Sequence, residues 1–274
     1  MSQAGVPGSH AGRLTDPYST GILSKDLPTE RERLRLLERD SDPHTLEILQ
    51  GLPVTPSWRC LDLGAGSGSI AYWLADRCRD GHVVAADIDV RFLDRARLDN
   101  VEIRQFDVGR DWFPAGSFDL IHSRSVLCHI LARDTVLAQA VEWLAPGGWL
   151  VAGEPYMFAP DTSPYPPLRR FYRAVDERWV AQGSDMRWAR RLPGLMAQAG
   201  LRRLEVATRS RCMGLGGAYD AFVLATIHQI GGIMVKDGNI TQAELDQMVA
   251  LFGDPAFADV RSVFITVSGQ KPED

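Results

Sequence analysis

The chain has 274 residues, of which 35 are acidic and 30 are basic, and its formal net charge is −5 at pH 7. A nucleic-acid groove is basic, so this charge and the lack of any Lys/Arg tract argue against a nucleic-acid partner. No signal-peptide segment and no apolar run of ~18 residues is present, and this argues against a membrane partner. Four scattered cysteines are typical of reduced thiols, so we expect a cytoplasmic protein.

Two short helices are predicted ahead of the first strand. Thr29-Glu30-Arg31-Glu32 has the spacing of a capping box, which predicts the start of the first helix. Ser41-Asp42-Pro43 predicts the start of the second, because proline is favoured in a first helical turn. We therefore expect residues 1–50 to form an N-terminal helical cap on a main domain of residues 51–274.

The most informative stretch is a glycine-rich turn between a strand and a helix. The apolar run Cys60–Leu63 stops at Gly64-Ala65-Gly66-Ser67-Gly68, and apolar residues then return at helical spacing. Glycine permits the positive φ of a tight turn and lets a ligand lie against the backbone. The N-terminus of the following helix favours a negative group. This turn is therefore predicted to bind a ligand with a negative group.

Four further strands are predicted in the middle of the chain. They cover His82–Asp87, Val101–Asp107, Ser117–Arg124 and Trp149–Gly153. Helices are predicted between them near residues 91–98 and 135–144, and this alternation is typical of a parallel sheet. The first two of these strands end in an acid. In a doubly wound sheet, an acid at the end of the second strand accepts hydrogen bonds from ribose hydroxyls.

The C-terminal part departs from strict alternation. Amphipathic helices are predicted over residues 168–179, 188–199 and 219–230, and a second capping box, Thr241-Gln242-Ala243-Glu244, begins another. Strands are predicted at Leu204–Thr208 and Val263–Ser268. We expect the insertions 156–186 and 212–257 to form a lid over the ligand edge of the sheet. Alternatively, they pack only on the outer face of the sheet.

Five of these segments, in this order across residues 60–155, make the chain resemble the class I S-adenosylmethionine-dependent methyltransferases. The remainder more loosely resembles the small-molecule branch that serves bacterial secondary metabolism. The resemblance implies an α/β fold, a doubly wound, seven-stranded, mostly parallel sheet of the Rossmann-like kind with helical lid insertions. The last strand would then run antiparallel to the others.

The resemblance also implies S-adenosyl-L-methionine as cofactor, and it assigns cofactor-binding residues. From the methionyl end to the adenine end, these residues are Tyr18, Asp62, Gly64, Ala65, Gly66, Gly68, Ser123, Arg124, Asp87, Ile88, Asp107 and Val108. Asp62 would help to bind the amine, Asp87 the ribose, and Asp107 the adenine amino group. The three acids alternatively serve as helix caps or turn residues, and Arg124 as one half of an ion pair.

Methyl transfer needs little from the protein beyond alignment and the exclusion of water, with a base where the acceptor loses a proton. His129 is the first candidate base, with a role in shaping the substrate site as the alternative. Glu154 is a second candidate, as a base or as a partner for a polar group of the substrate. Tyr156, Phe171, Tyr172 and His228 are the candidates for binding the substrate. No cluster of residues has metal-ligand spacing, so no metal is expected.

The sequence leaves several functions open. The leading prediction is methylation of a small, fairly apolar metabolite on oxygen, nitrogen or carbon. The alternatives are methylation of a peptide, a non-methylating reaction such as a cyclisation on the same fold, and an NAD-dependent dehydrogenase. Ser69 stands at the third glycine position of the dinucleotide fingerprint and weighs against the dehydrogenase. A homo-oligomer is compatible with the sequence, but no residue demands it.

Overall fold

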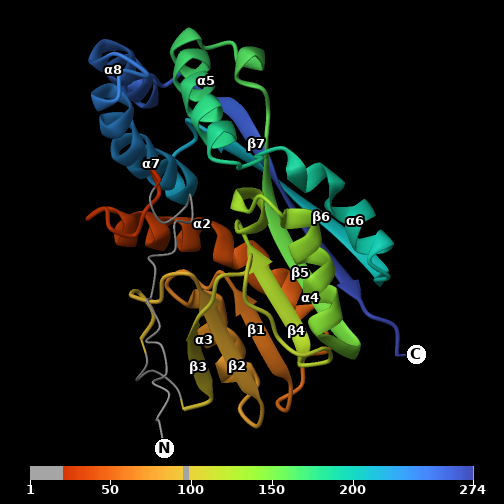
Figure 1. Cartoon of the computed structure of the whole chain (residues 1–274). Coiled ribbons are helices and arrows are strands. Elements are labelled where there is room, and N and C mark those ends of the chain that lie inside the picture. The colour runs from red at the N-terminus through yellow and green to blue at the C-terminus, as the bar shows by residue number, and fades with distance from the viewer. Residues whose placement is uncertain (1–20, 95–98, 274) are drawn as a thin grey trace, which may run out of the picture.

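A computed structural model describes residues 21–94 and 99–273 of the chain (Figure 1). Its helices are α2 (Glu30–Gln50), α3 (Ser69–Arg77), α4 (Arg133–Trp143), α5 (Pro166–Ala181), α6 (Leu192–Gln198), α7 (Gly217–Lys236) and α8 (Gln242–Ala250). Its strands are β1 (Arg59–Leu63), β2 (His82–Asp87), β3 (Val101–Gln105), β4 (Phe118–Arg124), β5 (Leu144–Met157), β6 (Arg202–Met213) and β7 (Asp259–Gln270). Short 3₁₀ helices are η1 (Leu127–His129), η2 (Pro160–Thr162), η3 (Trp188–Arg191) and η4 (Leu251–Gly253).

The strands form one seven-stranded sheet in the order β3-β2-β1-β4-β5-β7-β6. The pairs from β3 to β5 are parallel, whereas β7 runs antiparallel to both β5 and β6. This confirms the predicted doubly wound, mostly parallel sheet with an antiparallel last strand. The chain order reverses between β1 and β4, and the carboxyl ends of strands at such a switch point are where open α/β sheets bind ligands.

Within the described part of the chain, buried apolar residues form three clusters, one on each face of the sheet and one within a separate layer of helices. One cluster joins α4 and α6 to β1, β4 and β5, and a second packs α3 against β1 and β2. A third cluster joins α5, α7 and α8 above the sheet. Figure 1 shows α2 crossing between the helical layer and β1–β4, while β6 and β7 rise from the sheet toward α5. Helix α7 packs against α2, which links the two parts.

The two predicted N-terminal helices are one continuous helix, α2, with Pro43 inside it. Thr29 makes no side-chain cap, because its hydroxyl donates instead to Gln229 at 2.6 Å. Ser41 and Asp42 do not begin a helix, because they accept hydrogen bonds from arginines on other elements. Tertiary partners on β4 and β6 therefore replace the caps that the local sequence predicts.

Other elements differ from prediction mainly at their ends. Residues 91–94 form turns rather than a helix, and the remainder of that predicted helix lies outside the described residues. The predicted helix at 188–199 begins as the 3₁₀ helix η3 and continues as α6, and the sixth strand extends to Met213. The capping box at α8 is confirmed, because the side chains of Thr241 and Glu244 each accept from the other's backbone N–H.

Helix α7 is 20 residues long and, by length and composition alone, is apolar enough to cross a membrane. The sequence shows no apolar run of this length, because scattered polar residues interrupt the apolar residues of α7. In this fold the helix buries Val223, Ile227 and Ile230 in the helical layer. Such burial is also typical of a core helix in a globular protein.

Candidate active site

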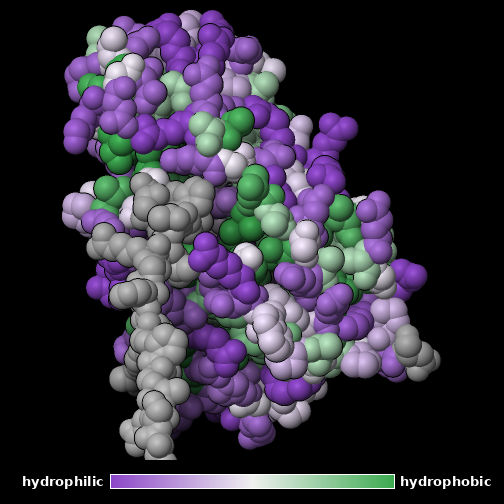
Figure 2. Space-filling model, viewed as in Figure 1, coloured by the Kyte–Doolittle hydropathy of each residue, from purple (hydrophilic) through white to green (hydrophobic). Residues whose placement is uncertain are grey.

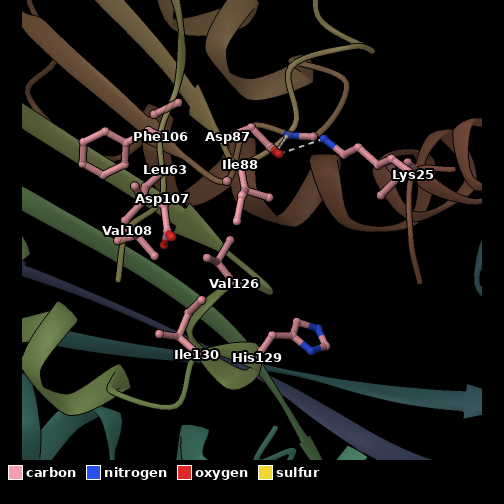
Figure 3. A pocket seen from close by; sticks show the side chains of 14 residues that line it. Lys25, Leu63, Asp87, Ile88, Phe106, Asp107, Val108, Val126, His129 and Ile130 are labelled. Carbon is pink, nitrogen blue, oxygen red and sulfur yellow. Dashed lines mark hydrogen bonds and ion pairs between the residues drawn. The ribbon is translucent and has the colours of Figure 1, made fainter. Parts of the chain in front are cut away.

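The first cavity lies at the carboxyl ends of β1 and β2, beside the loops that follow β3 and β4, and holds about 730 Å³ of empty space that is partly open to solvent. Figure 3 shows Asp87 and Lys25 on one side of it and His129 and Ile130 on the opposite side. Its lining residues are Lys25, Leu34, Leu63, Gly64, Gly66, Ala86, Asp87, Ile88, Phe106, Asp107, Val108, Val126, His129 and Ile130. The cavity therefore occupies the ligand position expected for a doubly wound sheet.

The glycine turn supplies the floor of this first cavity. Gly64, Gly66 and Gly68 have φ values of 77°, 61° and 91°, a region in which residues with a Cβ are strained. A Cβ on Gly64 would stand 2.1 Å from a methyl carbon of Val126, so this position has no room for a side chain. Gly64 and Gly66 line the cavity, whereas Gly68 ends the turn as the N-cap of α3 and Ala65 is buried away from it.

Asp87 ends β2 at the edge of the cavity and is almost completely buried. Its Oδ1 accepts from the Lys25 ammonium at 2.8 Å and from the Asp89 N–H at 2.9 Å. Its Oδ2 accepts from the Gly66 N–H at 2.8 Å, which ties the end of β2 to the glycine turn. A carboxylate has about four acceptor positions, so one position on Oδ2 is left for a ligand.

The segment after β3 forms the opposite end of the cavity. Asp107 and Val108 line it together with Phe106 and Ile88. The Asp107 Oδ1 accepts from the Gly109 N–H at 3.0 Å, which is the turn role that the sequence left open as an alternative. The Asp107 Oδ2 lies 3.5 Å from the Arg110 Nε, and the carboxylate borders the cavity beside Phe106 and Val108, where it could also accept from the amino edge of a flat aromatic ring.

Several residues predicted to bind the cofactor lie away from the cavity wall. The Asp62 carboxylate is buried and binds His122 at 2.7 Å. Arg124 forms the alternative ion pair, with Asp42 at 2.7 Å, and the Ser123 side chain is buried without a hydrogen-bond partner. Tyr18 lies outside the described residues. Any contact of Asp62, Ser123 or Arg124 with a ligand at this cavity would therefore involve the backbone or a movement of the side chain.

A second cavity of about 860 Å³ adjoins the first and shares Leu34 and His129 with it. It lies between α2, α5, α7 and the ends of β5–β7, and it is partly open to solvent. Its lining residues are Leu23, Arg33, Leu34, Leu37, Ser125, His129, Pro155, Met157, Tyr172, Trp179, Met186, Arg211, Tyr219, Phe222, Val223, Thr226, Ile227, Ile230 and Arg261. Most of this wall is apolar or aromatic, and the charged members are arginines. Figure 2 shows hydrophobic side chains gathered in the band between the helical layer and β1–β4.

His129 ends η1 on the boundary between the two cavities. Its Nδ1 lies 3.3 Å from the Ser184 hydroxyl. Burial, with the positive charges of Arg33 and Arg133, lowers the pKa of His129 from 6.5 to about 4. The imidazole is therefore neutral at pH 7, but it is a weak base, because a proton gained in a reaction would face two arginines.

Glu154 and Tyr156 do not face either cavity, contrary to the prediction. Side chains alternate along a strand, and Pro155 and Met157 of β5 are the residues that line the second cavity. The buried Glu154 carboxylate accepts from the N–H groups of residues 126, 127 and 128, at 3.1, 2.8 and 3.2 Å. Burial raises the pKa of this carboxyl. Glu154 therefore holds η1, and with it His129, in place.

The predicted substrate residues on the helices are only partly brought together. Tyr172 lines the second cavity, whereas Phe171, its neighbour on α5, is completely buried in the helical layer. His228 is exposed, because the buried face of α7 runs through Val223 and Ile227. The prediction that Phe171 and His228 line the substrate site is therefore wrong: Phe171 is a core residue, and His228 is a surface residue.

Sequence reasoning missed two sets of lining residues. Lys25 is one of three lysines in the chain, and this scarcity is its only sequence signal. Arg211 and Arg261 were missed because the sixth strand was predicted to end at Thr208 and the last strand to begin at Val263, so neither residue was assigned to a strand or to the lid. The alternation of arginines at 209 and 211 is the pattern of a strand and would have extended it.

Among the residues that the structure describes, no group of three or more His, Cys, Asp or Glu side chains is arranged to hold a metal ion. The polar groups at the first cavity include the carboxylates of Asp87 and Asp107, the Lys25 ammonium, the His129 imidazole and the backbone of the glycine turn. These groups suit the hydroxyls and amines of an organic ligand.

Residues 61–152 match the protein family described as "Methyltransferase domain". Among curated proteins, the chain is similar to methyltransferase str3 of Strobilurus tenacellus, with 38% identity over 97 residues. This match covers 35% of this chain and 35% of that protein, so the chain spans about a third of the length of this relative.

Solved structures share the fold over most of the chain. A phosphoethanolamine N-methyltransferase 2 of Haemonchus contortus, in complex with phosphomonomethylethanolamine and S-adenosylhomocysteine, aligns with a TM-score of 0.55 and 18% identity. That alignment covers 93% of this chain and 56% of the other. The cyclase SpnF aligns with a TM-score of 0.52 and 16% identity, over 85% and 82% of the two chains.

Proposed function

We propose that the chain is a class I S-adenosylmethionine-dependent methyltransferase and that it transfers a methyl group to a small, largely apolar molecule held in the second cavity. The observation that carries this proposal is the pair of adjoining cavities that share Leu34 and His129. One cavity has the glycine turn and the acids that suit the cofactor. The other is large, aromatic and apolar, as binding sites for small organic molecules are.

S-adenosyl-L-methionine fits the chemistry of the first cavity. We propose that Asp87 accepts a hydrogen bond from the ribose with its remaining acceptor position on Oδ2. Asp107 would accept from the adenine amino group, with Ile88 and Val108 against the ring and Gly64 and Gly66 beside the methionyl part. When bound, the sulfonium supplies a methyl group that is already electrophilic.

The residues of this chain would contribute alignment and the exclusion of water rather than strong base catalysis. His129 lies where the cavities meet, and its low pKa makes it a poor proton acceptor. We therefore propose that His129 positions the acceptor and that Glu154 positions His129 through η1. Holding the acceptor and the methyl donor in line can lower the barrier by several kcal/mol, about 7–11 in favourable intramolecular models.

The lid and the cellular role form the finer part of this proposal. Helices α5 and α7 close the second cavity, so we propose that residues 156–186 and 212–257 act as the lid over a main domain of residues 51–274, with α2 of the N-terminal cap roofing both cavities. A cytoplasmic enzyme of secondary metabolism suits this description. Two copies could exchange lid helices, although no described residue demands this.

A non-methylating reaction on the same fold is the second candidate. The observation that favours it is that the polar group on the shared wall, His129, has a pKa too low for an effective base at neutral pH. Under this alternative the cofactor would be structural, and the second cavity would fold a substrate for an intramolecular reaction such as a cyclisation.

The test is to incubate the protein with methyl-labelled S-adenosylmethionine and an extract of small metabolites, and to separate the products by mass. Methyl transfer predicts a labelled small molecule together with S-adenosylhomocysteine, and the label should vanish with Asp87→Ala. Turnover of a substrate without any label would instead support the second candidate. Label found only on peptides would contradict the small-molecule acceptor.

A further inference from the structure

Two arginines with low exposure stand in the wall of the second cavity. Arg211 on β6 and Arg261 on β7 are 7% and 4% exposed, and both line the cavity. The register of these strands shifts between Arg211, which pairs with Ser262, and the next residue, which pairs with Val260. Arg261 is thereby left as the extra residue of a bulge. A bulge re-aims a side chain, and this one brings the two arginines to one cavity.

Neither guanidinium is fully satisfied by the protein. The Arg211 Nε and the Arg261 Nε and Nη2 have no hydrogen-bond acceptor. The remaining contacts of Arg211 are Ser41 at 2.7 Å and Asp40 at 3.0 Å. Arg261 donates to the Phe158 carbonyl, and its Nη2 lies 3.5 Å from the Asp176 Oδ1, an oxygen that also has no hydrogen-bond partner. Buried N–H groups in a native protein are normally paired, so these unmet donors suggest a missing partner.

The carboxylates near Arg211 and Arg261 are each shared with another arginine. Asp40 is shared between Arg209 and Arg211, and Asp176 is shared between Arg187 and Arg261. Arg187 and Arg209 are 39% and 40% exposed and reach solvent, whereas Arg211 and Arg261 are buried at the cavity and each has only a shared carboxylate to compensate its charge. Burial lowers the pKa of Arg211, which agrees with an incompletely compensated charge. Such a charge is costly unless an anion compensates it.

Aromatic rings hold both guanidinium planes in place. Arg211 lies between Tyr219 and Phe264, at 5.4 and 4.5 Å from their ring centroids, and Arg261 lies 4.4 Å from the centroid of Tyr172. Stacked arginines lose little freedom on binding and present fixed donors that match the oxygens of carboxylates and phosphates. These residues are therefore buried, oriented cations rather than two surface charges.

We propose that the methyl acceptor carries an oxyanion, a carboxylate or a phosphoryl group, which Arg211 and Arg261 bind while the apolar wall holds the rest of the molecule. This inference rests on the proposed function, because it names the acceptor class of the same second cavity. The oxyanion fixes the orientation of the acceptor at the end of the cavity formed by β6 and β7. His129 marks the other limit, where the cavity meets the cofactor site.

The test uses three probes of similar shape: 3-phenylpropanoate, phenethyl phosphate and 3-phenylpropanamide. Each is titrated by calorimetry into the full chain saturated with S-adenosylhomocysteine. At least one acid should bind about ten-fold or more tightly than the neutral amide, because only an acid completes the buried arginines. Tighter binding of the carboxylate than of the phosphate identifies a carboxylate acceptor, and the reverse identifies a phosphoryl acceptor.

The variants Arg211→Met and Arg261→Met should each weaken binding of the preferred acid by about ten-fold or more. Arg209→Met is the matched control, because Arg209 lies on the same strand and shares Asp40, but its side chain is 40% exposed and does not line the cavity. We expect only a small loss with this variant. Equal losses with Arg209→Met and Arg211→Met would overturn the proposal.

The affinity of each protein for S-adenosylhomocysteine is measured first and separates the possible failures. Intact binding of S-adenosylhomocysteine, with no preference for either acid over the amide in the wild-type protein, would overturn the oxyanion site alone. No binding of S-adenosylhomocysteine by folded wild-type protein would overturn the proposed function as well. A variant that fails to bind it is excluded from the comparison, and the wild-type preference then decides.

Discussion

Alanine at two positions of the glycine turn should have different effects: Gly64→Ala should mainly lower the stability of the protein, and Gly66→Ala should mainly lower its affinity for the cofactor. Gly64 and Gly66 both have positive φ, 77° and 61°, so alanine at either position carries the same left-handed strain, about 1–2 kcal/mol. The two sites differ in their surroundings. The new Cβ would meet Val126 at 2.1 Å in Gly64→Ala but no atom within 4 Å in Gly66→Ala.

Gly64→Ala must therefore displace Val126 as well. Overpacking of this kind costs about 1–3 kcal/mol, so this variant should be less stable than Gly66→Ala by that amount. Gly66→Ala should lose only the unfolding free energy that corresponds to its backbone strain. Its new methyl group, however, would project into open space at a residue that lines the first cavity. Its affinity for S-adenosylmethionine should fall by about ten-fold or more, since ~1.4 kcal/mol lost at the ligand surface is sufficient.

Urea unfolding at pH 7 measures the first effect, and calorimetric titration with S-adenosylmethionine measures the second. The reasoning is refuted if the two variants lose the same stability, because the contact with Val126 would then carry no cost. It is also refuted if Gly66→Ala binds the cofactor as tightly as the wild-type protein does.

Three further predictions concern stability. Glu154→Ala removes the acceptor of three N–H groups, those of residues 126, 127 and 128, and should cost about 3 kcal/mol in urea unfolding, whereas Glu154→Gln keeps an acceptor and should cost less; equal losses would contradict the positioning role. The pKa of His129 is about 4 in the folded protein and 6.5 ordinarily, so the unfolded chain binds a proton more readily than the folded one. The contribution of His129 to stability is therefore complete above pH 6.5 and is lost as the pH falls toward 4. The wild-type protein should thus lose more stability than His129→Gln between pH 7 and pH 5, and parallel losses would argue against the lowered pKa. Thr241→Ala removes the confirmed capping box of α8 and should cost about 1 kcal/mol, and an unchanged urea midpoint would mean that the cap contributes nothing.

The fold was predictable from sequence because strand and glycine signals are local. The run at β1 and its glycine turn, the acid that ends β2, and the apolar stripe of α5 all follow from periodicity and turn chemistry. The same locality explains the errors at α2. Ser41 and Asp42 have the composition of a helix start, but arginines distant in sequence bind their side chains, and the helix continues through Pro43.

The first cavity was predicted better than the second. Gly66, Asp87 and Asp107 line this cavity from a turn or from the end of a strand, and such positions are set by the local sequence. The second cavity is assembled from elements far apart in sequence. Whether Tyr156 or Met157 faces it depends on a one-residue register, and Arg261 reaches it through a bulge that no local pattern marks.

The most direct test of the central claim is calorimetric titration of S-adenosylmethionine into the wild-type protein, Asp87→Ala and Asp89→Asn. Asp89→Asn is the matched control, because Asp89 lies in the same loop but does not line the first cavity. The account predicts one site per chain for the wild-type protein and for Asp89→Asn. It predicts at least about a hundred-fold weaker binding for Asp87→Ala, because the Asp87 carboxylate holds the glycine turn and is proposed to bind the ribose. Unchanged binding by Asp87→Ala, or no binding by the folded wild-type protein, would contradict it.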